Sequence, residues 1–152
     1  MKIYRGNIFY CKSLSEYDEI ENGFLIVDDD GRIVQVCSVL PEEYEKDPVI
    51  NCGNNLIIPS FCDIHLHSAQ FVNTGLGYHL PFEDWLTLYT YPAERQYRDI
   101  RKAEQINRRL IHSLWKFGTM NAAIMGSTDA LSTYLLMKQL SESGMSAYIG
   151  KM

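Results

Sequence analysis

The chain has 152 residues, of which 46% are hydrophobic and 22% charged, and its formal net charge is -5 at pH 7. This length allows one substantial hydrophobic core or two small ones, and the composition is ordinary for a globular protein. The acidic balance argues against a nucleic-acid partner, because phosphate binding requires clustered lysine and arginine side chains.

Strand signals dominate the first third of the chain. The N-terminal segment lacks the apolar core of a signal peptide, and the alternation over residues 2–11 predicts a strand. Residues 24–27 and 32–39 predict a hairpin that turns at residues 29–31. After an acidic surface segment with room for a short helical turn, residues 49–61 return to the strand pattern. We therefore expect a small β-unit of meandering hairpins.

Strand and helix signals alternate beyond Pro59. Residues 61–67 predict a short strand, and residues 68–81 predict a long loop that contains two glycines. Pro81 is well placed in the first turn of a helix, because its fixed φ angle suits that position.

Two long helices with a buried strand between them complete the predicted order. Asp99 is the expected N-cap of the first helix, whose apolar residues recur every three or four positions and which ends at Gly118. A short apolar strand follows. Thr128 or Ser127 is the expected N-cap of the second helix, which ends at Gly144, and a further strand begins after it.

This alternation predicts an α/β fold with a parallel sheet and right-handed crossovers. Residues 60–152 are too few for a closed (β/α)8 barrel, which needs about 250 residues. The second part of the chain is therefore either a small open α/β sheet or the opening third of a barrel. The abrupt end after the last strand favours a fragment.

Two histidines stand at the end of the strand predicted over residues 61–67. Side chains alternate between the faces of a strand, so His65 and His67 project together, with Asp63 on the same side. Imidazole suits zinc, and a catalytic zinc needs three protein ligands and an open position for water. Their place before a glycine-containing loop favours metal binding over two histidines satisfied by backbone or solvent.

Other polar and aromatic residues near this strand have two interpretations each. The Gln70 amide offers a donor and an acceptor that can match the edge of a lactam or amidine ring, or it faces water. Trp85 can cover a flat ring, or it packs in the core. His79 and His112 are expected to be structural or exposed.

The cysteines and the hydropathy pattern favour a cytoplasmic protein. Four cysteines stand far apart without a CxxC pair, so we expect buried thiols in a reducing compartment rather than a disulfide framework or a zinc knuckle. No apolar run approaches the roughly 20 residues that a helix needs to span a bilayer. We expect no membrane partner.

The segments IIPSFCDIHLHSAQ and LPFEDWLTLYTYPAE follow one another closely. Together they resemble the amidohydrolase superfamily and, within it, the guanine deaminases. The superfamily places an Asp-x-His-x-His strand first in its barrel, and guanine deaminases add a glutamine and a Leu-Pro to Pro-x-Glu segment. The resemblance implies a β-sandwich-like domain over residues 1–57. It also implies the first strands and helices of an incomplete (β/α)8 barrel over residues 58–152.

The resemblance further implies a zinc-dependent hydrolysis in which guanine and water give xanthine and ammonia. His65 and His67 correspond to the first two metal ligands. Trp85 corresponds to an aromatic residue that forms one wall of the purine site. The stretch that lines the purine corresponds to His67, Ser68, Ala69 and Gln70.

The family's other metal ligands and its proton-transferring residues lie downstream of the part that this chain matches. The resemblance therefore implies no catalytic residue within the 152 residues and an inactive isolated chain. A complementing C-terminal portion or a homo-oligomer is the implied partner. The chain departs from the pattern at Ser60, where glycine is usual, and at Met120 and Asn121, where threonine is commoner.

Two alternatives stay open. The chain can derive from another aminohydrolase or chlorohydrolase of the same superfamily, with a different ring substrate. It can also be a non-enzymatic remnant or interaction module that binds a partner through an open sheet edge.

Overall fold

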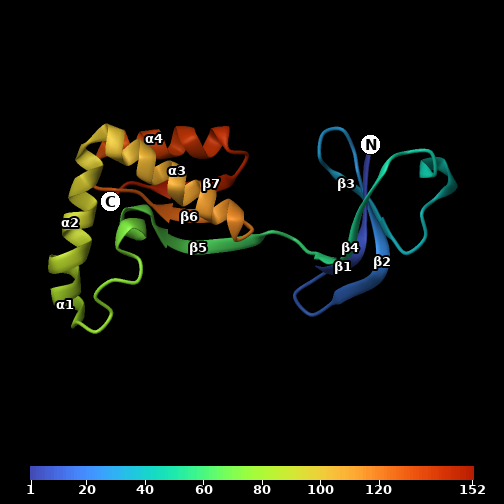
Figure 1. Cartoon of the computed structure of the whole chain (residues 1–152), viewed down its shortest axis with the longest axis horizontal. Helices are drawn as coiled ribbons and strands as arrows, with labels where there is room; N and C mark the ends of the chain where they lie inside the picture. Colours follow the sequence, from blue (N-terminus) through green and yellow to red (C-terminus); the bar gives the residue numbers. More distant parts are fainter. The chain divides into compact units, whose positions relative to one another are not determined.

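Two long antiparallel strands, β1 (Lys2–Cys11) and β2 (Tyr17–Val27), form the centre of the first unit of the chain. The computed structural model describes all 152 residues and divides into two units, Met1–Pro59 and Ser60–Met152 (Figure 1). No helix in it combines the length and the apolar character needed to cross a membrane.

The first unit is a four-stranded sheet in the order β3-β2-β1-β4, with β3 at Ile33–Cys37 and β4 at Val49–Ile57. A short 3-10 turn, Glu42–Tyr44, lies in the acidic segment before β4, as the sequence indicated. Ile3, Ile8 and Ile26 are the buried side chains of this sheet.

Two expectations about this unit are wrong. β2 begins at Tyr17, seven residues before the predicted hairpin strand, because its first half pairs with β1 while exposing mostly polar side chains. Apolar alternation is therefore a weak signal there. The sheet is also not a simple meander, since β4 crosses to the far side of β1 and pairs with it in parallel.

The second unit is a mixed α/β structure. β5 (Phe61–His67), β6 (Thr119–Met125) and β7 (Ser146–Gly150) form a parallel sheet in the order β5-β6-β7, which confirms the predicted alternation. The helices α3 (Ile100–Lys116) and α4 (Ala130–Glu142) contribute the buried residues that pack against one face of this sheet (Figure 1).

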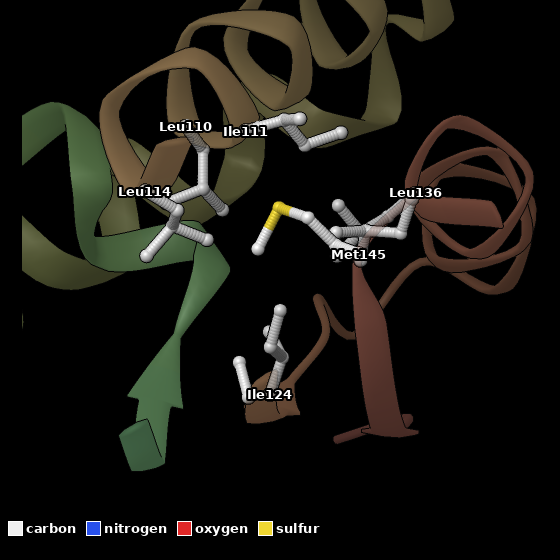
Figure 2. Close-up of a cluster of buried hydrophobic side chains, with 8 residues drawn as sticks. Leu110, Ile111, Leu114, Ile124, Leu136 and Met145 are labelled. Carbon is white, nitrogen blue, oxygen red and sulfur yellow. The ribbon is translucent and has the colours of Figure 1, made fainter. Parts of the chain in front are cut away.

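The main core of the second unit lies between the two long helices and the sheet. Figure 2 shows α3 residues and Leu136 of α4 converging on Met145, with Ile124 of β6 below them. Leu66 of β5 packs against the same cluster. Since side chains alternate along a strand, this leaves His65 and His67 on the face away from α3 and α4. The buried members are Leu110, Ile111, Leu114, Ala122, Ile124, Leu136, Leu140 and Met145.

Both long helices begin at an aspartate. Asp99 caps α3 as predicted, since its Oδ1 accepts from the backbone N–H groups of Arg101 (3.0 Å) and Lys102 (3.4 Å). The prediction for α4 is wrong, because Asp129 is its N-cap and accepts from the N–H of Ser132 at 2.8 Å. The Ser127 hydroxyl is instead held 2.6 Å from that of Ser132.

A run of short helical turns joins β5 to α3. The predicted loop after β5 is wrong at its start, because Ser68–Asn73 forms 3-10 turns that bury Ala69 against Tyr97 and Ala103. The predicted helix after Pro81 is present as three consecutive pieces, followed by a 3-10 turn at Gln96–Arg98. Those pieces are α1 (Phe82–Trp85), a π-helical turn (Leu86–Thr90) and α2 (Tyr91–Arg95).

The expectation of buried thiols is also wrong. All four cysteines are free, but Cys11 and Cys62 are exposed, and Cys37 and Cys52 are only partly buried. Cys11 is the last residue of β1 and Cys62 is the second residue of β5, so both lie near the ends of exposed stretches of their strands.

Candidate functional site

A cavity of about 740 Å³ lies beside the carboxyl end of β5. Its wall combines the end of this strand with α1, the π-helical turn and α2. Four residues predicted from the sequence line it, namely His65, His67, Gln70 and Trp85. The other lining residues are Leu66, Phe71, Asn73, Thr74, Tyr78, Phe82, Leu86, Thr90, Tyr91, Glu94 and Met152.

The two histidines lie edge to face at the mouth of β5. Their ring centroids are 5.0 Å apart, with an interplanar angle of 69°. Two imidazoles on one tetrahedral zinc, with zinc–nitrogen distances of about 2.0–2.1 Å, have ring centroids about 5 Å apart. The Nδ1 atom of His67 is buried and has no hydrogen-bond partner. The pair therefore fits two positions of a zinc site.

The chain does not complete such a site. No group of three or more histidine, cysteine, aspartate or glutamate side chains is placed to hold a metal ion. Asp63, which the strand pattern puts on the same face as the histidines, uses its Oδ1 to accept from the His65 N–H at 3.0 Å. It does not line the cavity. The side chains at this cavity therefore offer two imidazoles to a metal ion.

Ser68 and Ala69 lie behind the cavity rather than on its surface. Both side chains are buried, and neither residue lines the cavity. The Ser68 hydroxyl donates to the backbone oxygen of Met125 at 3.3 Å, and Ala69 packs in the core cluster around Tyr97. These residues fix the backbone that connects His67 to Gln70.

Gln70 and Trp85 both line the cavity, one before and one after the loop that joins them. Gln70 accepts from the Thr74 hydroxyl through its backbone oxygen at 3.3 Å, which leaves its side-chain amide for a ligand. The Trp85 ring donates from Nε1 to the backbone oxygen of Leu76 at 2.9 Å and stacks with Phe82 at 6.1 Å. The indole is therefore held in place as a flat apolar wall.

Gly77 lets the rings of Trp85 and Tyr89 pack closely against the backbone of the loop. Its φ of +71° favours glycine, and a Cβ at this position would lie 2.6 Å from Tyr89 Cε2 and 3.0 Å from Trp85 Cδ1. No other residue type fits here without moving both rings.

Sequence reasoning missed two buried groups near the cavity. Glu94 lines it and is only 9% exposed, and its Oε1 accepts from the Thr128 N–H at 2.9 Å. Tyr97 is 1% exposed and donates from its hydroxyl to the Ser68 oxygen at 2.7 Å. Burial, and then the nearby Glu94 carboxylate, raise the pKa of Tyr97 far above its ordinary value, so this hydroxyl remains a donor. The Tyr-Pro-Ala-Glu segment, which ends at Glu94, was the part of the sequence that could have pointed to this buried carboxylate.

The remaining histidines lie elsewhere. His79 and His112 are exposed, which agrees with the prediction, and neither lines this cavity.

Several known proteins similar to this chain are guanine deaminases. A guanine deaminase from Dictyostelium discoideum is 28% identical over 167 residues, covering 99% of this chain and 37% of its own length. The Homo sapiens guanine deaminase is 26% identical, covering 98% of this chain and 35% of its own length. The crystal structure of a guanine deaminase from C. acetobutylicum, with guanine bound in its active site, matches with 35% identity and a TM-score of 0.90. No protein-family model matches the chain.

The match covers nearly all of this chain but only part of each relative. The chain spans little more than a third of the two curated relatives, and 35% of the C. acetobutylicum structure superposes on 98% of the chain. The chain is thus a homologue of the N-terminal portion of guanine deaminases.

Proposed function

We propose that the chain supplies the first two zinc ligands and part of the purine site of a guanine deaminase. The observation that carries this proposal is the convergence of His65, His67, Gln70 and Trp85 on one cavity. The similarity to guanine deaminases over 98–99% of the chain supports it.

We also propose that residues 1–57 are a β-sandwich-like domain and that residues 58–152 begin a (β/α)8 hydrolase barrel. The parallel order β5-β6-β7 supports the barrel proposal for residues 58–152, since helices pack on one face of these strands and the histidines lie on the other. Active sites of such barrels lie at the carboxyl ends of the strands, which is where the cavity is.

The four cavity residues named above have different roles in the proposed site. His65 and His67 would hold zinc, which would supply Lewis-acid activation of water for the hydrolysis. The Gln70 amide binds the lactam or amidine edge of guanine. His67, Ser68, Ala69 and Gln70 form the proposed substrate-binding stretch, in which Ser68 and Ala69, buried behind the cavity, contribute through the backbone. The Trp85 ring covers the purine face and excludes water. The remaining ligands and the proton-transferring groups come from elsewhere.

Because the chain supplies only part of the proposed site, we also propose a partner and a cellular context. A complementing C-terminal portion, or a homo-oligomer, is the proposed partner, and purine catabolism in the cytoplasm is the proposed context. Four free cysteines are consistent with a reducing compartment.

A completed chain tests the proposal. In it, residues 1–152 are continued by the remaining part of the C. acetobutylicum guanine deaminase, whose matching third has the same fold. We expect this protein to retain zinc and to release ammonia from guanine, and the 152-residue chain alone to do neither. Absence of turnover in a folded, zinc-containing completed chain contradicts the proposal. Turnover of adenine or cytosine derivatives in place of guanine favours the alternative of another aminohydrolase.

Gln70→Leu in the completed chain is expected to lower kcat/KM for guanine by about 10- to 100-fold. Leucine has nearly the same volume but leaves the polar purine edge unpaired, which costs about 1–3 kcal/mol. Steady-state ammonia release measures the change. Thr87→Val is the matched control, because Thr87 is exposed, does not line the cavity and only donates to the Glu83 backbone oxygen. Equal kinetics for Gln70→Leu and the unchanged enzyme would exclude the purine contact.

A further inference from the structure

One helical segment reaches the ends of two neighbouring strands through buried polar side chains. Glu94 of α2 and Tyr97 of the following 3-10 turn are three residues apart, so their side chains lie on one face of the segment. Figure 1 shows α1 and α2 running past the end of the sheet at which β7 terminates. In a parallel sheet this is also the end at which β5 and β6 terminate.

Tyr97 ties this segment to the end of β5. Its hydroxyl donates to the backbone oxygen of Ser68 at 2.7 Å, and both residues are only 1% exposed. Ser68 is the residue immediately after His67 and lies two positions before Gln70. The bond therefore acts on the backbone between the proposed metal ligand and the proposed purine contact.

Glu94 ties the same segment to the loop after β6. Its Oε1 accepts from the Thr128 N–H at 2.9 Å, and the residue is 9% exposed. A bond from a backbone N–H to a charged acceptor is stronger than a neutral one, and burial protects it from water.

A third hydrogen bond joins Ser68, the residue after β5, directly to the end of β6. The Ser68 hydroxyl donates to the backbone oxygen of Met125, the last residue of β6, at 3.3 Å. The helical segment, the end of β5 and the end of β6 are thus joined in pairs. A shift of any one of them has to break or stretch two of the three bonds.

We propose that Tyr97 and Glu94 are positioning residues of the purine site, which hold the His67–Gln70 backbone against the ends of β5 and β6. This inference rests on the proposed function and adds to it, because neither side chain is assigned a contact with guanine or zinc. A displacement of about 1 Å in a substrate-positioning group can cost about 100-fold in rate, so a buried tie to this backbone has a direct kinetic consequence.

Kinetics of the completed chain test the proposal first. We expect Tyr97→Phe, which removes only the hydroxyl, to raise KM for guanine about 10-fold while zinc content stays unchanged. Glu94→Ala is expected to do the same, and Glu94→Gln, which keeps an acceptor oxygen, to restore most of the loss. Tyr134→Phe is the matched control, since Tyr134 is 64% exposed on α4. A purely structural role would lower the unfolding temperature and leave the KM of the folded enzyme unchanged.

Hydrogen exchange measured on the 152-residue chain is the second test, and it needs no turnover. Tyr97→Phe is expected to speed amide exchange in peptides that cover residues 65–73 and to leave those of β7 and α4 unchanged. Uniform acceleration over the whole second unit, or no acceleration, would overturn the positioning role.

The two tests separate the two proposals. Guanine turnover by the unchanged completed chain, with an unaltered KM in Tyr97→Phe, overturns positioning and leaves the proposed function intact. No turnover by the unchanged completed chain overturns the proposed function and the positioning role with it, even where the exchange effect at residues 65–73 is observed.

Discussion

Replacing His65 and His67 together by alanine is expected to remove zinc from the completed chain and to abolish ammonia release from guanine. Their ring centroids lie 5.0 Å apart, which suits two ligands of one zinc ion. Loss of an outer-shell partner alone costs about 10- to 100-fold in affinity or activity, so loss of two ligands is expected to cost more than about 100-fold. Metal analysis and steady-state ammonia release measure the two effects separately.

His112→Ala is the matched control for this experiment. His112 is exposed on α3 and does not line the cavity, so its removal is expected to change neither zinc content nor turnover. Full activity of the His65→Ala and His67→Ala double variant would refute the metal role of the pair. A double variant that retains zinc but loses activity would refute the ligand assignment while keeping both residues in the site.

The second large effect concerns the core that supports the site. Leu136→Ala is expected to lower the free energy of unfolding by about 2–5 kcal/mol, because it leaves a cavity among α3, α4 and the sheet. Leu136 is 1% exposed and lies in the cluster shown in Figure 2. Urea denaturation of the 152-residue chain, followed by circular dichroism, measures the change.

Leu131→Ala on the same helix provides the comparison. Leu131 is 61% exposed, so the same chemical change removes little buried surface and is expected to cost less than about 1 kcal/mol. Similar losses for the two variants would mean that α4 does not pack as described.

The sequence predicts best where a buried face imposes a period. The apolar repeat of α3 and its Asp99 cap were both correct, because this helix buries one face along its whole length. The alternating strands of the second unit were correct for the same reason. The histidine pair could be placed from the strand period, together with Gln70 at the following turn.

Features that depend on distant partners could not be predicted in this way. The first half of β2 is held by backbone pairing with β1, and Ser68–Asn73 turns because Ala69 finds an apolar cluster built from α3 and Tyr97. Serine, threonine and aspartate are all good caps, so the residue types alone could not distinguish Asp129 from its neighbours. Glu94 and Tyr97 acquire their partners only once β5 and β6 are adjacent.

His67 lines the cavity, and its Nδ1 atom is buried without a hydrogen-bond partner. A buried nitrogen without a partner is a cost that the folded chain bears and the unfolded chain does not. Any group that binds there only in the folded state stabilises that state by mass action, by about 2.7 kcal/mol at a ligand concentration 100 times its Kd. A ligand that occupies this cavity is therefore expected to raise the unfolding free energy of the second unit as its concentration rises.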